Sequence, residues 1–299
     1  MGKSNESQAK AGGSTLRRKK RSNMSLIMHR LAKNKVAMVS LGVLILLILV
    51  SIAAPLIAPY DPYAIDLSAM KQGPSKAHIF GTDSMGRDIF SRILYGGRYS
   101  LALGFIGSIF TAFIGTVFGT IIGYIGGRVD NVCMRICDVW QAIPGQLLAI
   151  VISVALGSGF FNTILAMSIG GIPMSIRSTR AMCLKEREME YLESAVSYNC
   201  SKAKIMFKHM LPNIISPTIV GTTMSVGGTI MGAAGLSFIG LGIQAPTPEW
   251  GAMLSDARNM ALLYPYMMIF PGLMIAITVL AINLFGDGLR DAMDPKLKN

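Results

Sequence analysis

Residues 193–213 read ESAVSYNCSKAKIMFKHMLPN, a polar stretch that ends beside a proline and lies between long apolar segments. In and beside it, two sets of mostly apolar residues recur at helical spacing. The sets are Leu192, Ala195, Val196 and Asn199, and then Ile205, Met206, Met210 and Leu211. Asn199 and Ser201 lie between the sets, and Asn tolerates the left-handed backbone conformation of a tight turn. The pattern predicts two short helices that join near Asn199, the second ending at Pro212.

The surrounding segment 184–210 cannot cross a membrane, because nine of its side chains are charged. A charged helix gains nothing from contact with lipid, so we interpret this segment as a contact for a soluble partner protein. The alternative is an amphipathic helix on the lipid headgroups, attracted there by its lysines.

The composition of the 299 residues is that of an integral membrane protein, with 52% hydrophobic residues and 15% charged residues. The net charge of +12 comes mainly from one tail and one loop, without the interleaved aromatic residues that stack bases, which argues against nucleic acid as a partner. We expect the four cysteines to be free thiols. Cys133 and Cys137 are four positions apart, but no His or further Cys stands near them in sequence to complete a metal site.

Six segments are apolar and long enough to cross the hydrocarbon layer, which takes about 20 residues. They are 36–58, 99–127, 132–156, 160–176, 214–242 and 263–286. The first segment is too long for the apolar part of a cleaved signal peptide, so we interpret it as an uncleaved anchor. The sequence therefore predicts an all-α, multi-pass protein of the plasma or inner membrane, with both termini on the same side.

The basic residues indicate which side that is, because Lys and Arg favour cytoplasmic loops. Residues 1–35 carry ten of them and the loop 177–213 carries seven. With both regions inside, 22 basic residues lie on the cytoplasmic side and six lie outside. We expect the first 20 or so residues to be disordered. The predicted parts are a basic cytoplasmic tail (1–35), a first span with an extracellular segment (36–98), a core (99–288) containing the cytoplasmic loop 184–213, and a cytoplasmic C-terminal tail (289–299).

Several features inside the predicted spans have both a structural and a functional interpretation. Arg135 and Asp138 lie near the cytoplasmic end of the third span, where snorkelling or a pair three residues apart explains them without a transport role. Prolines kink the spans, which suits a moving pathway but is common in helices that do not move. They are Pro144, Pro173 and Pro271.

The fifth span is rich in small residues, which let another helix approach closely. The face expected to form a helix interface or part of a translocation path comprises Ser225, Gly228, Gly232, Gly235 and Ser237. Close helix packing is the simpler explanation, and the spacing does not say whether the partner helix belongs to this chain or to a second subunit.

The loop resembles the "EAA" signature of the permeases of ATP-binding-cassette (ABC) importers. The matching positions are Glu193, Ser194, Ala195, Asn199, Ser201, His209, Leu211, Pro212 and Asn213. In that family the loop docks into a cleft on a cytosolic ATPase and transmits its closure to the membrane helices. This chain has Asn199 where the family usually has Gly, a difference that we expect to preserve coupling while stiffening the turn.

Three further segments resemble one branch of these permeases, the second membrane subunit of the peptide and nickel uptake systems. They are GTDSMGRDIFSRILYGGRYSLALG (81–104), LSFIGLGIQAPTPEWGAML (236–254) and NLFGDGLRDAMDPKL (283–297). The resemblance implies a type I importer permease fold, a second permease subunit, two cytosolic ATPases that bind ATP and Mg²⁺, and an extracellular or periplasmic binding protein. The branch often has an acidic residue before the LSF triplet, where this chain has Ala233, which affects any preference for charged substrates.

On the extracellular side, the resemblance suggests a docking surface for the binding protein. The residues expected to be exposed there are Asp83, Arg87, Asp88, Arg92, Pro246 and Trp250. A simpler interpretation of 83–98 is an interfacial helix whose charged side chains stay in water while its apolar side chains face lipid or protein.

The sequence contains no ATP-binding GxxxxGK[ST] motif and no catalytic motif, so we expect a transport subunit that is not an enzyme and binds no cofactor or metal itself. The expected substrates are di- or oligopeptides, with nickel, a metal chelate or a glutathione-like solute as alternatives. A secondary transporter driven by an ion gradient is a remote alternative, because no inverted repeat or midplane ionisable residue is apparent. A membrane scaffold without transport leaves the matched loop unexplained.

Overall fold

The computed structural model describes residues 23–293, and within that range every regular element is a helix. Residues 1–22 and 294–299, which include most of the predicted basic tail and the end of the C-terminal tail, lie outside the described range. In chain order the helices are α1 (Asn23–Lys33), α2 (Lys35–Ile52), α3 (Ala54–Ile57), η1 (Leu67–Ala69), α4 (Ile89–Ile125), α5 (Gly127–Gln141), α6 (Gly145–Leu156), α7 (Phe160–Arg187), α8 (Glu190–Ser197), α9 (Lys202–Lys204), η2 (Ile205–Met210), α10 (Leu211–Phe238), α11 (Trp250–Ala257), η3 (Arg258–Met260) and α12 (Tyr266–Met293).

Four helical stretches in the described range are long and apolar enough to cross a membrane. They are α2, α4, α12 and the run Lys202–Phe238, which joins α9, η2 and α10. The predicted third span is broken: α5 and α6 meet at 81° and together give a fifth candidate. The break falls at Pro144, which lacks an N–H and disfavours helix in the residue before it. The fourth predicted span lies in α7, which carries Arg177, Arg180 and Lys185 and is not among the candidates.

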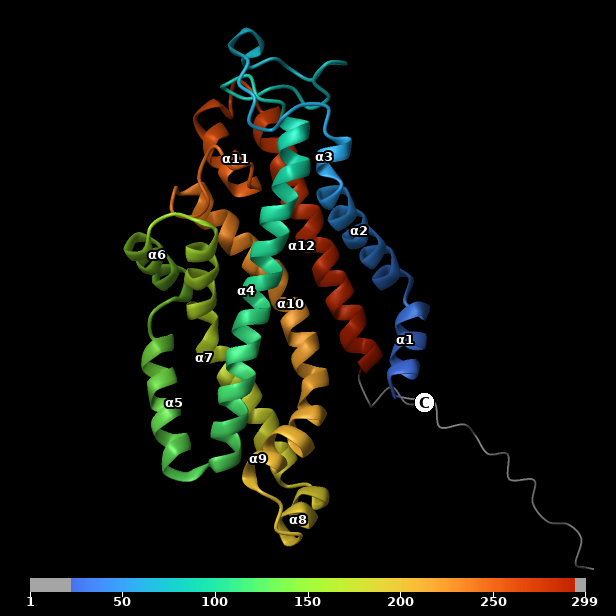
Figure 1. Cartoon of the computed structure of the whole chain (residues 1–299), viewed down its shortest axis with the longest axis vertical. Coiled ribbons are helices and arrows are strands. Elements are labelled where there is room, and N and C mark those ends of the chain that lie inside the picture. The colour runs from blue at the N-terminus through green and yellow to red at the C-terminus, as the bar shows by residue number, and fades with distance from the viewer. Residues whose placement is uncertain (1–22, 294–299) are drawn as a thin grey trace, which may run out of the picture.

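The helices run between two opposite ends of an elongated molecule (Figure 1). We call the end formed by residues 58–88 and α11 the cap end, and the opposite end, formed by residues 188–210, the α8 end. Helix α2, the α5–α6 pair and α10 run toward the cap end, whereas α4, α7 and α12 run away from it (Figure 1). Helix α1 and the first turn of α2 pack beside the last turns of α12 through Leu31, Ala37 and Ala292. The two ends of the described chain therefore lie close together.

Helices α4 and α7 pack closely along a glycine seam. A Cβ added at Gly119 would lie 2.6 Å from Thr179 Cβ, and one at Gly123 would lie 2.7 Å from Cys183 Cβ. Gly115, one turn earlier, lies against Ser175 in the same way. Small residues four positions apart allow membrane helices to approach this closely. The small residues of the fifth span predicted such packing on α10, whereas the seam between α4 and α7 was not predicted.

Two ion pairs fix α5 against α7. Asp130 of α5 pairs with Arg180, and Asp138 pairs with Arg177. The expected explanation of Asp138, a pair with Arg135 or snorkelling, is therefore wrong for the aspartate, because its partner is 39 residues away on the next long helix. These pairs compensate for charge that α5 and α7 carry close to the apolar spans.

Candidate coupling surface and transport cavity

The two short helices predicted at the α8 end are present, and Asn199 joins them. Asn199 has φ 53°, the left-handed conformation expected of the turn. The Ser201 side chain then accepts a hydrogen bond from Lys204 N (3.4 Å) and caps α9. The prediction that Pro212 ends the second helix is wrong. Pro212 lies in the first turn of α10, where its missing N–H costs little, and the chain stays helical from Lys202 to Phe238.

The helices of the α8 end bury one face and expose the other. A small core holds them to α7 and α10 through Cys183, Leu192, Ala195, Ile205, Met210 and Ile214. On the opposite face, Val196 is 58% exposed and Tyr198 is 85% exposed. Glu193, Ser194 and Asn199 are also exposed. Three matched residues, Glu193, Ser194 and Asn199, thus share an anchored, exposed face with the apolar Val196 and the aromatic Tyr198, a composition that suits a protein contact.

A hydrogen-bond chain that the sequence analysis missed anchors the start of α8. Tyr191 donates its hydroxyl proton to Glu186 Oε2 at the end of α7 (2.6 Å), and it accepts from Asn213 Nδ2 of α10 (2.8 Å). Burial, followed by the hydrogen bond to Glu186, raises the pKa of Tyr191 to about 12. Asn213, the last residue of the matched motif, therefore ties α8 to the helix that runs on through the molecule. The position of Tyr191, two residues before Glu193, gives no signal of this role in sequence.

A cavity of 350 Å³ lies between α4, α7 and α10. Its lining includes the predicted path residue Ser225, together with Ser108, Thr111, Ser175, Thr222 and Thr229. A second cavity of 670 Å³ lies between the α8-end portions of α7, α10 and α12. Met182, Pro217 and Gly221 line both, so the two cavities adjoin.

The other predicted path residues do not line these cavities. Gly232 lies against Met167 of α7, and a Cβ added at Gly235 would lie 3.5 Å from Gln146 Nε2. Ser237 is fully buried and accepts a hydrogen bond from Ile243 N (3.2 Å), so it holds a turn. A Cβ at Gly228 would meet nothing within 4 Å, so no described helix of this chain packs closely there, and close packing against a second subunit stays a prediction.

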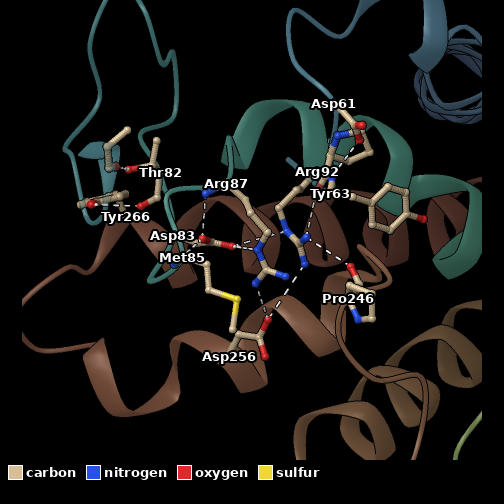
Figure 2. A network of polar contacts seen from close by, with 12 residues as sticks. Asp61, Tyr63, Thr82, Asp83, Met85, Arg87, Arg92, Pro246, Asp256 and Tyr266 are labelled. Atoms are coloured by element: carbon tan, nitrogen blue, oxygen red, sulfur yellow. Dashed lines mark hydrogen bonds and ion pairs between the residues drawn. The ribbon is translucent and has the colours of Figure 1, made fainter. Parts of the chain in front are cut away.

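The charged residues expected to be exposed at the cap end are instead buried in a network (Figure 2). Arg87 donates to Asp83 Oδ2 through Nε (2.6 Å) and to Asp256 Oδ2 through Nη2 (3.0 Å). Arg92 Nη1 donates to the carbonyl oxygens of Pro62 (3.0 Å) and Pro246 (3.3 Å). Arg87 is 2% exposed and Arg92 is 1% exposed. The expectation that these side chains stay in water is wrong.

The remaining expected docking residues also take part in the bonding of the cap end, and one of them, Pro246, is exposed as well. Asp88 caps α4 by accepting from Ser91 N (2.7 Å) and pairs with His78 Nδ1 (3.0 Å). Trp250 is 1% exposed and donates to the Ile93 carbonyl oxygen (3.0 Å). Pro246 follows a cis peptide bond and is exposed.

Glu249, just before Trp250, is a further buried group that the sequence analysis missed. Its carboxylate accepts from Ala252 N (2.8 Å) and from Ser100 Oγ (3.0 Å), which joins α11 to α4. Burial raises the pKa of Glu249. In the part of the chain that the structure describes, no three His, Cys, Asp or Glu side chains group in a way that could hold a metal ion.

Known proteins share this architecture and sequence. Residues 115–299 match the family model described as "binding-protein-dependent transport system inner membrane component", and residues 22–74 match the "N-terminal TM domain of oligopeptide transport permease C". A glutathione transport system permease protein, GsiD, from Escherichia coli O157:H7 is 48% identical over 271 residues, which is 90% of this chain and 89% of the relative. Its counterpart from Shigella flexneri serotype 5b is 49% identical over the same span and coverage.

Solved structures of the MetNI methionine ABC transporter in inward-facing conformations share the fold. One has a TM-score of 0.55 at 18% identity and covers 67% of this chain and 96% of its own. Another has a TM-score of 0.53 at 20% identity, covering 66% and 94%. The family match over 115–299 includes the α8 end and the α7 and α10 walls of the cavities. The chain belongs to the family of binding-protein-dependent transport system inner membrane components and is a multi-pass permease subunit of an ABC importer of the inner membrane.

Proposed function

We propose that this chain pairs with a second permease subunit to form the pathway of an importer for small peptides. In this proposal a binding protein outside the membrane delivers the solute, and two cytosolic ATPases drive transport. The observation that carries the proposal is the α8 end, where an exposed face with Tyr198 at its centre is anchored by a buried core. A surface of this kind suits a protein partner, and the resemblance to the coupling loop supports the ATPase as that partner.

The α8 end faces the cytoplasm in this proposal. The basic residues of 177–213 and of the N-terminal region support this orientation. The alternation of helix directions in Figure 1 supports six passes, in which α7 crosses once and the bent α5–α6 pair crosses once. The contact between α1 and the end of α12 supports termini that lie on the same side.

Coupling follows from the continuity of one helix. The stretch Lys202–Phe238 begins beside α8 and runs into the wall of the 350 Å³ cavity. When the ATPases close and move α8, the Tyr191–Asn213 bond and the small core transmit that movement to α10. The cavity then changes the side to which it opens. By thermodynamic linkage, the free energy by which a state of the ATPases favours one state of the pathway equals the free energy by which that pathway state favours the same state of the ATPases.

The substrate class is proposed from the relatives, which are named for glutathione, a small peptide. The cap end is the proposed face for the binding protein. The buried network of Asp83, Arg87, Asp88 and Arg92 with Trp250 keeps this face in shape, and the exposed Pro246 is the residue of the original set that is accessible for contact.

Catalysis and cofactors belong to the partners in this proposal. ATP and Mg²⁺ bind to the ATPase subunits, and this chain is a transport subunit without an enzymatic reaction of its own. Lipid surrounds the apolar faces of α2, α5 and α12.

Purification of the chain in mild detergent, followed by mass analysis of its partners, tests the proposal. We expect a second permease and ATPases to co-purify, and reconstituted complexes to accumulate peptide when loaded binding protein and ATP are present. If only a nickel salt or a metal chelate stimulated ATP hydrolysis, the importer function would stand and the peptide substrate would be overturned. Recovery of the chain without any ATPase, under conditions that retain the second permease, would overturn the coupling assignment.

A further inference from the structure

The 350 Å³ cavity has an unusually uniform chemistry. Its lining consists of hydroxyl, thioether and small side chains, and among the residues described by the structure it includes no charged or amide side chain. Four hydroxyls stand on one side of α10, at positions three or four residues apart. They belong to Thr218, Thr222, Ser225 and Thr229.

The protons of these four hydroxyls are already engaged. Each one is donated to a backbone carbonyl oxygen in the preceding turn of α10. The bonds run from Thr218 to Ile214 (2.8 Å), Thr222 to Thr218 (2.8 Å), Ser225 to Thr222 (2.8 Å) and Thr229 to Ser225 (3.0 Å). A hydroxyl has one proton and two lone pairs. These oxygens therefore present acceptors to the cavity, although Thr229 also contacts Ser108 Oγ (2.9 Å).

Pro217 frees a further acceptor on α10, next to this wall. It lies inside α10 and lines the cavity, and proline has no N–H to donate to the carbonyl four residues earlier. The carbonyl oxygen of Asn213, a residue that lines the second cavity, thus loses its helical partner. Such freed carbonyls persist in membrane helices where they line a polar cavity.

We propose that this cavity binds the transported solute through the solute's own N–H donors, an α-ammonium group above all. The inference rests on the proposed function and adds the chemical group that the pathway recognises. On the α10 wall a carboxylate would meet only lone pairs, whereas an ammonium group would meet acceptors. Hydroxyls that could donate to a carboxylate stand on the opposite wall, at Ser175 and Ser178 of α7. The volume of the cavity is at the lower end of the range of small-molecule sites, roughly 300–1,000 Å³, which suits a di- or tripeptide.

Protection of an introduced thiol measures this binding directly. Gly221 lines both cavities, and a Cβ there would meet nothing within 4 Å, so Gly221→Cys is sterically accommodated. The half-buried Cys133 and Cys200 are first replaced by Ala to lower the background. The rate at which a small maleimide alkylates the new thiol is then measured in the purified complex, without binding protein, at increasing concentrations of a tripeptide.

We expect the tripeptide with a free amino terminus to slow alkylation, and its N-acetylated form to require an about tenfold higher concentration for the same protection. Equal protection by the two forms would overturn the proposed recognition of the ammonium group. A thiol that is not alkylated even without peptide would show that solutes cannot reach the cavity, and would overturn the inference as well.

A matched pair of variants locates the recognition on the cavity wall. Thr222→Val removes a lining oxygen with little change in shape, and we expect it to weaken protection by the free-amine tripeptide about fivefold while leaving the acetylated form unchanged. Thr223→Val is the control, because Thr223 makes the same bond to the Ile219 carbonyl oxygen (2.9 Å) but lies outside the lining. Equal effects of the two variants would overturn the assignment to this wall.

Peptide accumulation by the unaltered complex with its binding protein separates this inference from the proposed function. Accumulation of peptide without protection of the Gly221→Cys thiol would overturn the inference and leave the peptide importer in place. Absence of peptide accumulation by a complex that hydrolyses ATP would instead overturn the proposed function.

Discussion

The cap end and the α8 end are both polar segments between apolar helices, yet they use their charged residues in opposite ways. At the cap end Arg87 and Arg92 are almost fully buried and bonded to carboxylates and carbonyls of the same chain. At the α8 end Glu193 and Tyr198 project outward from an apolar base. The connection 58–88 contains little regular helix, so side chains must satisfy its backbone and hold its shape. The α8 end satisfies its own backbone and leaves its side chains for a partner.

Charge reversal at the exposed end provides the largest expected functional effect. Glu193→Lys should reduce solute-stimulated ATP hydrolysis of the assembled complex by more than about tenfold, because it places a like charge or an unpaired ion in the proposed contact. The melting temperature of the purified chain should not change, since Glu193 is exposed. Asp291→Lys, an exposed acid at the end of α12, is the control and should retain stimulation. Unchanged stimulation in Glu193→Lys would mean that α8 is not the coupling surface.

Removal of a buried charge at the cap end should have the opposite character. Arg87→Ala removes the nearest partner of Asp83 and Asp256 and leaves only Arg92, at 3.7 and 4.0 Å from them. The change should cost about 3 kcal/mol of stability and lower the melting temperature in detergent by about 5 °C or more. Lys76→Ala, an exposed basic residue of the same segment, should have no measurable effect. If the two variants have the same melting temperature, the network does not stabilise the cap end.

Substitutions at two glycines, one in the seam between α4 and α7 and one on α10, distinguish a closely packed position from an open one. Gly119→Ala should destabilise the chain by about 1–3 kcal/mol, because the new methyl group would overlap Thr179. Gly228→Ala should be neutral or slightly stabilising, because a Cβ meets no atom of this chain there and Ala favours helix. The two melting curves check both statements. A larger loss for Gly228→Ala would place the tight interface on α10, against a second subunit.

The smallest expected effect tests how the α8 end is attached. Tyr191→Phe removes the bonds to Glu186 and Asn213 and should lower stimulated ATP hydrolysis about two- to fivefold without preventing assembly. Because the pKa of Tyr191 is raised to about 12, the hydroxyl remains a proton donor at lower pH. Its stabilising contribution is complete below the ordinary tyrosine value of about 10 and declines only as the pH rises toward 12. The ratio of wild-type to variant activity should therefore stay constant from about pH 6 to 9.

Local features of the molecule could be predicted from the sequence. The two helices at the α8 end and the turn at Asn199 depend on residues within one or two turns of each other. The apolar character of α2, α4 and α12 is likewise visible in a short window. The continuation of the second helix through Pro212 was missed because a proline can start a helix as readily as it can end one.

Features that depend on distant partners could not be predicted. Arg87 is buried because Asp256 lies opposite it, 169 residues later in the chain. Asp138 finds its partner on α7, and the glycines of α4 are distinguished from those of α10 only by which helix approaches them. The repeated small residues at 115, 119 and 123 were the available signal for the seam.

Hydrogen exchange in the complete complex, with and without its ATPase subunits, tests the contrast between the two ends most directly. The account predicts that bound ATPases slow exchange of backbone amides in α8 and α9 by about tenfold or more, while exchange in 58–92 stays the same. If bound ATPases slowed exchange at the cap end and left exchange in α8 unchanged, the assignment of α8 as the surface that receives the ATPase would be contradicted.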